Sequence, residues 1–130
     1  MDILTTERLT KVYGQGATAL KALDNVSLSI GQGEFVAIVG SSGSGKSTLL
    51  HLMGGVDRPT SGTVRLAGTN VYARSDEELA VLRRREVGLV YQFYNLIPVL
   101  NVVENMTLPV LMDGRKVNEE RLRTLLDGLG

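Results

Sequence analysis

Apolar and polar residues alternate along much of the first half of the chain, and glycine-containing turns separate the alternating segments. Alternation with a period of two predicts a β-strand with one buried face. The pattern predicts strands at residues 3–12, 22–30 and 63–66. Residues 34–39 and 87–91 are apolar at most positions, which is typical of strands buried on both faces of a parallel sheet. We therefore expect a mixed α/β chain.

Helix signals follow these strands. Residues 47–53 predict a helix that ends at the glycine pair after it. We expect Pro109 to interrupt the next-to-last helix or to end it nearby, because proline lacks a backbone N–H. The last helix is expected to end at Gly128 or Gly130. Capping residues predict three helix starts, at Ser75, Asn101 and Asn118.

Composition excludes several classes of function. The 130 residues are 43% hydrophobic and 22% charged, which is ordinary for a globular protein. The 14 basic residues balance the 14 acidic ones, so sequence-independent nucleic-acid binding is not expected. There is no cysteine, and the single His51 excludes a multi-histidine metal site. The N-terminus has no signal-peptide pattern, and the longest apolar run, residues 35–39, is far shorter than the roughly 20 residues that a membrane span needs. We expect a cytosolic protein.

The strongest chemical signal is Gly-Ser-Ser-Gly-Ser-Gly-Lys-Ser at residues 40–47, which fits the phosphate-loop pattern G-x-x-x-x-G-K-[ST]. Glycines let the backbone approach an anion closely, and the N–H groups and the helix N-terminus that follow point toward it. We expect Lys46 to contact the β- and γ-phosphates and Ser47 to bind Mg²⁺. The alternative is a flexible loop that matches by chance, which its position between an apolar strand and a helix disfavours. The predicted nucleotide-binding residues are Gly40, Ser41, Ser42, Gly43, Ser44, Gly45, Lys46, Ser47 and Thr48.

Segments on both sides of the loop resemble the nucleotide-binding domain of ATP-binding cassette (ABC) transporters, and the resemblance covers the whole chain. It rests on Leu-Thr-Lys-Val-Tyr at 9–13, Asp-Arg-Pro-Thr-Ser-Gly at 57–62 and Val-Gly-Leu-Val-Tyr-Gln at 87–92. Residues 92–98 and 103–109 look like the subgroup that drives lipoprotein release, macrolide export and peptide-antibiotic export. The resemblance implies a P-loop NTPase fold of the α/β class, the ABC ATPase core, with an antiparallel N-terminal β portion.

The resemblance also implies residue roles. Tyr13 matches the aromatic residue that stacks on adenine; the alternative is a strand aromatic packed in the core. Gln92 matches the Q-loop glutamine that touches magnesium or the attacking water; the alternative is a hydrogen bond at a strand end. ATP and Mg²⁺ are thus the expected cofactors, with Lys46 and Gln92 as catalytic residues and Ser47 and Gln92 at the metal.

Partners follow from the same resemblance. The apolar cluster from Phe93 to Leu100 matches the region that contacts the transmembrane subunits, although it could instead fold back into the domain's own core. A homodimer of cassettes, located in the cytoplasm at the inner face of the cell membrane, is implied for the complete protein. No nucleic acid is expected. His51 is expected to be an ordinary helix-face residue, and residues 83–85 (Arg-Arg-Arg) a solvated helix face.

Several family features are not found. The Leu-Ser-Gly-Gly-Gln signature, the strand that ends in Asp-Glu and the switch histidine are missing from the sequence. Asp113 is a poor match for the magnesium-anchoring aspartate, because Pro109 precedes its segment and Gly114 follows it. We therefore expect a cassette that stops in its helical subdomain, with residues 1–92 as the β portion, phosphate loop and core strands, and 93–130 as the Q-loop and the first helices.

Three expectations about activity and stability follow. The chain by itself is expected to bind ATP without sustained hydrolysis. Its two strands of the buried type, 34–39 and 87–91, are expected to be partly uncovered, which predicts marginal stability, domain swapping or self-association. The alternative functions are a nucleotide-binding module without turnover, a small phosphoryl-transfer kinase and a non-transport ABC ATPase.

Overall fold

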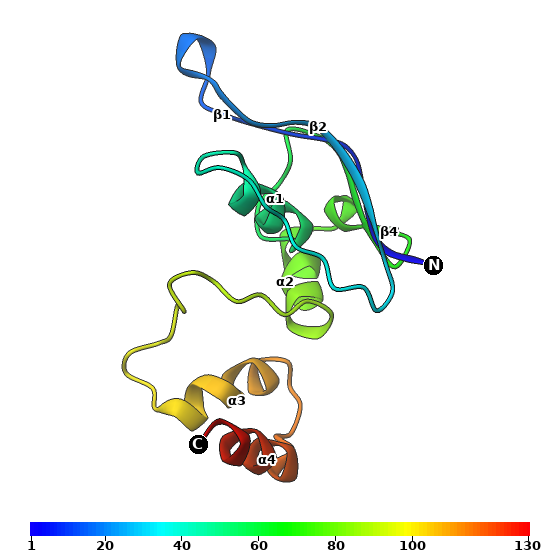
Figure 1. Ribbon diagram of the computed structural model, residues 1–130. Coiled ribbons are helices and arrows are strands. Elements are labelled where there is room, and N and C mark those ends of the chain that lie inside the picture. The colour runs from blue at the N-terminus through cyan, green and yellow to red at the C-terminus, as the bar shows by residue number, and fades with distance from the viewer. The chain divides into compact units, whose positions relative to one another are not determined.

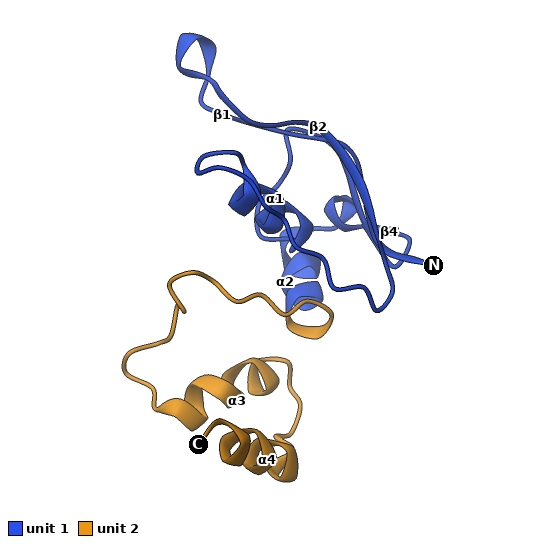
Figure 2. Ribbon diagram, in the orientation of Figure 1, with its two compact units in different colours: residues 1–83 blue, residues 84–130 orange.

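The computed structural model describes residues 1–130 and divides them into two compact units, residues 1–83 and residues 84–130 (Figure 2). Each unit is described by itself. The division into residues 1–92 and 93–130 that the family resemblance implies concerns the organisation of a cassette, and it stays a prediction.

The first unit contains a four-stranded antiparallel sheet in the order β2-β1-β3-β4. β1 and β2 run side by side as a long hairpin (Figure 1), joined through the short 3-10 helix η1 (Gly16–Thr18). The three strands that alternation predicted at 3–12, 22–30 and 63–66 are confirmed. The strands are β1 (Asp2–Tyr13), β2 (Leu20–Gly31), β3 (Ser61–Leu66) and β4 (Thr69–Asn70).

Two α-helices supply five of the nine buried apolar side chains of this unit. α1 (Lys46–Met53) begins after Gly45 and ends at Gly54, as predicted. α2 (Asp76–Arg85) follows η2 (Val71–Ala73) and has the expected capping box, in which the Ser75 and Glu78 side chains each accept the other's backbone N–H. The buried apolar side chains are Leu9, Leu23, Leu49, Leu52, Met53, Val64, Val71, Leu79 and Leu82. All of them belong to residues 1–83.

The second unit contains α3 (Val102–Met112) and α4 (Glu119–Leu129), both at predicted positions. Asn101 and Glu104 form a capping box, and Asn118 caps α4. Pro109 lies inside α3, and the helix continues for about one more turn before it ends at Met112. The helix tolerates the proline because the missing N–H removes only one hydrogen bond near its end. Thr107 is the one buried residue of this unit, so the unit has little core of its own.

The predicted strands at residues 34–39 and 87–91 do not form, and this part of the sequence interpretation was wrong. Both segments lack regular secondary structure and pair with no strand. A strand needs a neighbour that accepts and donates its backbone hydrogen bonds, and no strand of the structure pairs with either segment. Their apolar side chains are therefore exposed: Phe35 is 100% exposed and Val90 is 88% exposed.

The exposed apolar side chains of residues 34–39 and 87–91 favour self-association. We expect residues 1–130, as an isolated polypeptide, to self-associate at concentrations of about 1–100 μM, because unpaired apolar segments are templates for pairing with another chain. Sedimentation velocity over that range measures the effect, and Phe35→Ser combined with Val90→Ser should reduce it. A monomer whose cooperative melt does not depend on concentration would contradict the prediction.

Candidate nucleotide-binding site

The loop at residues 40–45 is a tight backbone turn in which two glycines adopt a conformation that strains any residue with a Cβ. Gly43 and Gly45 have φ angles of +78° and +94°, in the left-handed region. A Cβ on Gly45 would lie 2.4 Å from the backbone oxygen of Ala22, and a Cβ on Gly40 would lie 2.7 Å from Ser44 Oγ. The loop therefore lies directly against β2, which fixes its position relative to the sheet.

Lys46, the first residue of α1, folds its side chain back over this loop. Its Nζ donates hydrogen bonds to the backbone oxygens of Gly40 (2.8 Å) and Ser41 (2.6 Å) and to Ser44 Oγ (3.1 Å). The ammonium group is thus held at the mouth of the loop, where an anion would meet both its charge and the N-terminus of α1. The glycine-lined turn and this cation together fit a phosphate group.

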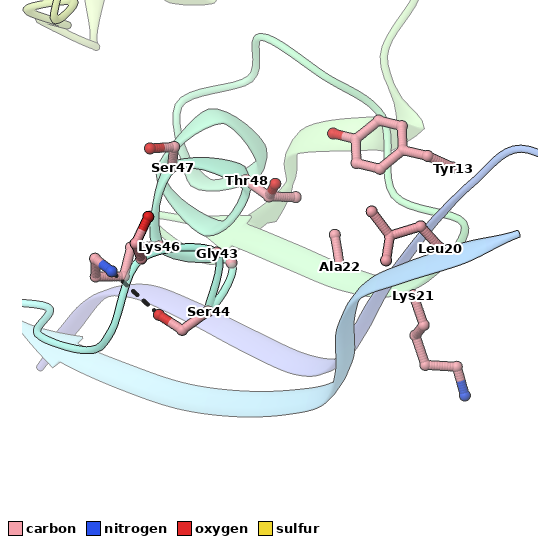
Figure 3. Close-up of a pocket in the computed structure, with 11 residues that line it drawn as sticks. Tyr13, Leu20, Lys21, Ala22, Gly43, Ser44, Lys46, Ser47 and Thr48 are labelled. Atoms are coloured by element: carbon pink, nitrogen blue, oxygen red, sulfur yellow. Dashed lines mark hydrogen bonds between the residues drawn. The ribbon is translucent and has the colours of Figure 1, made fainter.

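A cavity of about 440 Å³ opens beside the loop. Figure 3 shows its two sides: the loop and the start of α1 on one, and side chains from the ends of β1 and β2 on the other. The size suits a nucleotide-sized ligand. The lining residues are Tyr13, Leu20, Lys21, Ala22, Ser42, Gly43, Ser44, Gly45, Lys46, Ser47 and Thr48.

Tyr13 lies at the end of β1 and contributes to this cavity. Its side chain is 41% exposed, so it does not pack in the core as the alternative interpretation required. The Tyr13 hydroxyl donates a hydrogen bond to Asp57 Oδ2 (3.0 Å), and Lys11 Nζ lies over the ring, 5.1 Å from its centroid. The structure brings Tyr13 and the loop to one cavity, whereas stacking on adenine stays a prediction.

The sequence interpretation missed two residues that contact Tyr13, namely Asp57 and Lys11. Lys11 Nζ donates to Asp57 Oδ1 (3.2 Å) and to the backbone oxygen of Arg58 (2.6 Å). Burial raises the pKa of Asp57, but the hydrogen bonds from Tyr13 and Lys11 outweigh it, and the pKa lies below its ordinary value. Asp57 is thus a carboxylate at neutral pH. No local signal identifies this cluster, because Tyr13 and Asp57 are 44 positions apart.

The two predicted magnesium ligands, Ser47 and Gln92, belong to different compact units. Ser47 lies in the first turn of α1 and is exposed at the cavity (Figure 3). Gln92 belongs to the second unit, in an exposed turn after residues 87–91. Its expected contact with magnesium or water therefore stays a prediction, as does the role of Ser47.

The apolar cluster from Phe93 to Leu100 does not fold back into a core. The side chains of Phe93, Tyr94, Leu96 and Val99 are exposed, and only Leu100 is half-buried. A groove of about 400 Å³ lies along this segment, lined by Leu96, Ile97, Pro98, Leu100, Asn101, Val102, Asn105 and Met106.

Asn105 of α3 gives this segment its shape. Its Oδ1 accepts the Ile97 N–H (2.9 Å), and its Nδ2 donates to the backbone oxygens of Ile97 (3.2 Å), Leu100 (3.0 Å) and Asn101 (3.0 Å). One amide thus lies within hydrogen-bond distance of four backbone groups of residues 97–101. The sequence interpretation assigned no role to Asn105.

The arginine run at residues 83–85 is only in part the solvated face that we expected, because Arg85 is exposed while Arg83 and Arg84 are half-buried. Arg83 donates to the backbone oxygen of Gly55 (2.8 Å), while Arg84 and Arg85 contact Asp113, whose side chain is 1% exposed. The hydrogen bond from Arg85 lowers the pKa of Asp113 and outweighs desolvation. Asp113 is the C-cap of α3 and does not follow a strand, which agrees with its rejection as a magnesium anchor.

Fold and loop together define a P-loop nucleotide-binding protein. The sequence model of the ABC transporter family matches residues 23–130, and the chain belongs to this family. The predicted resemblance is confirmed. No helix of the structure combines the length and apolar character needed to cross a membrane.

Within the ABC transporter family, the chain is similar to ATP-binding proteins of lipoprotein-releasing systems. The lipoprotein-releasing system ATP-binding protein LolD of Xanthomonas campestris is 48% identical over 123 residues, which cover 95% of this chain and 52% of that protein. LolD of Legionella pneumophila is 42% identical over 130 residues, covering 98% and 57%. The chain therefore spans about half the length of the curated relatives it matches.

Among solved structures, the chain is similar to the ATP-binding cassette MJ0796, described as a dimer in a post-hydrolysis state bound to ADP and Pi. The TM-score is 0.86 at 41% sequence identity, covering 95% of this chain and 54% of that one. This similarity confirms the predicted fold class, the α/β ABC ATPase core.

Proposed function

We propose that this chain is the nucleotide-binding part of the ATP-binding subunit of an ABC transporter, which couples ATP binding and hydrolysis to export by membrane subunits. The observation that carries the proposal is the cavity between Tyr13 and the loop, with Lys46 held at the loop's mouth. The similarity to LolD proteins suggests that the exported substrate of the complete transporter is a lipoprotein.

In this proposal the adenine base stacks on Tyr13 and the phosphates enter the loop. Backbone N–H groups of residues 41–47 contact the phosphate oxygens, and Lys46 moves from the loop carbonyls to the β- and γ-phosphates. Ser47 and Gln92 are the proposed protein ligands of Mg²⁺, which neutralises charge on those phosphates when bound. Gln92 also orients the attacking water.

We propose hydrolysis for the complete protein, in a dimer of two cassettes as in the MJ0796 structure. For residues 1–130 by themselves we propose ATP binding without sustained turnover. The carboxylates that would anchor magnesium and activate water in this family are not among these residues.

The segment from Phe93 to Leu100 is the proposed docking surface for the transmembrane subunits, which would place the protein at the cytoplasmic face of the membrane. Its exposure and its apolar groove support an interface. The same exposure favours transport over the non-transport alternative, because an apolar loop suits a hydrophobic protein partner better than nucleic acid.

Replacing Leu96 and Val99 by aspartate tests this proposal in the complete transporter. We expect co-purification with the membrane subunits to fall at least about 10-fold, because charge at an apolar interface leaves a desolvated carboxylate. ATP affinity should stay within about 2-fold of the parent protein, because the loop cavity is untouched. Leu129→Asp, at an exposed apolar position of α4, is the matched control. Unchanged co-purification of the double variant would exclude docking through this segment.

A further inference from the structure

The orientation of the Tyr13 ring is fixed at two points by residues outside the phosphate loop. The ring lies at the end of a strand and is 41% exposed, so backbone structure alone leaves its side chain free to rotate. The hydroxyl is held by Asp57 Oδ2 at 3.0 Å, and one face of the ring is covered by the Lys11 ammonium, 5.1 Å from the centroid. The ring nevertheless lines the cavity beside the phosphate loop, where a ligand can reach it.

Asp57 is in turn held by several contacts. Its Oδ1 accepts hydrogen bonds from Lys11 Nζ (3.2 Å) and from the Arg58 backbone N–H (2.9 Å). Lys11 also donates to the Arg58 backbone oxygen (2.6 Å), and its side chain is only 15% exposed. Charge-assisted bonds in a partly desolvated place are stronger than surface ones. The turn after α1 is thus tied to β1 at the point where Tyr13 enters the cavity.

We propose that Asp57 and Lys11 are positioning residues for the nucleotide base, which hold the Tyr13 ring in the orientation that stacks on it. The inference rests on the proposed function, in which Tyr13 contacts adenine. Neither Asp57 nor Lys11 needs to touch the nucleotide, and neither lines the cavity. The ring is ordered before the ligand arrives, so binding does not have to immobilise it.

Loss of these positioning contacts should therefore weaken the binding of the base and leave the binding of the phosphates unchanged. A tyrosine ring that loses its anchor must be ordered on binding, which weakens affinity about 3- to 10-fold for one immobilised side chain. A ligand without a base never uses the ring, so its affinity is unaffected. Comparison of ATP with inorganic tripolyphosphate therefore separates positioning of Tyr13 from general damage to the site.

The experiment measures the affinities of ATP and inorganic tripolyphosphate for the full-length protein and its variants. Tyr13→Phe removes only the hydroxyl, and Asp57→Asn removes the charged acceptor. Each is expected to weaken ATP about 3- to 10-fold and tripolyphosphate less than about 2-fold. The double variant should bind ATP no more weakly than either single variant, because both changes break one hydrogen bond. Asp2→Asn, an exposed aspartate at the start of β1, is the control of equal charge change.

Each other outcome overturns a defined part of the argument. If Tyr13→Ala weakens ATP but Tyr13→Phe and Asp57→Asn bind it like the parent, stacking holds and the positioning role is wrong. Equal losses for ATP and tripolyphosphate would also contradict positioning, since they indicate damage to the whole site. If Tyr13→Ala leaves the ratio of the two affinities unchanged, adenine stacking itself is wrong, while ATP binding through the loop can still stand. Should Asp57→Asn lower the melting temperature, Lys11→Met replaces it with the same expectations.

Discussion

Replacement of Lys46 by alanine is expected to lower ATP turnover of the complete protein by about 10²- to 10³-fold, the size of effect seen when one preorganised donor to a developing charge is removed. The lysine is the cation at the mouth of the loop, held by three oxygen acceptors within 3.1 Å. Backbone N–H groups can still hold the phosphates, but no other side chain of the loop carries a positive charge.

The fold should survive this change. The acceptors that Lys46 leaves, on Gly40, Ser41 and Ser44, belong to exposed residues and can bond to water. Turnover and ATP affinity of Lys46→Ala are therefore compared with those of Lys116→Ala, which removes an equal charge from an exposed position of the second unit. Equal turnover in both variants would exclude phosphate binding through Lys46 and with it the proposed function.

Local signals predicted the strands β1, β2 and β3 and all four α-helices, but not η1, η2 or the short strand β4. The helix after the loop and the three caps depend on neighbours within a few positions, and all were found. The three long strands were found from their alternation, although they pair over longer separations, such as Leu4 with Leu66. The strands predicted at residues 34–39 and 87–91 do not form, because an apolar run gives the propensity for a strand but cannot supply the neighbouring strand that it needs. Strand formation there depends on non-local pairing, which one segment of sequence does not reveal.

The candidate site divides in the same way. The phosphate loop is contiguous, so a pattern of eight residues identifies it. The Tyr13–Asp57 contact joins positions 44 apart, and the ion pair between Arg85 and Asp113 joins positions 28 apart. Arg84 and Arg85 suggested a solvated face, and Arg85 does stay exposed, but both side chains also contact the Asp113 carboxylate at the end of α3. Such contacts are decided by the path of the chain between the two residues.

Gly45→Ala is expected to be the most destabilising single substitution in the loop, lowering the free energy of unfolding by about 3–5 kcal/mol. Two penalties combine at this position. Alanine in the left-handed region costs about 1–2 kcal/mol. The new Cβ would also lie 2.4 Å from the Ala22 backbone oxygen and 3.1 Å from Leu23 Cδ2, so the loop must move away from β2. Because Leu23 is a core residue, that movement opens the packing beneath α1.

Gly43→Ala separates the two penalties. Gly43 has a similar φ angle of +78°, but a Cβ there would meet no atom within 4 Å. We expect it to lower the free energy of unfolding by only about 1–2 kcal/mol. Urea unfolding of both variants, followed by circular dichroism, measures the difference. A total stability of about 5–15 kcal/mol leaves Gly45→Ala near the limit of folding. Equal losses in the two variants would mean that the loop does not lie against Ala22. In that case the inference that this contact fixes the position of the loop relative to the sheet, and hence to Tyr13, would be wrong.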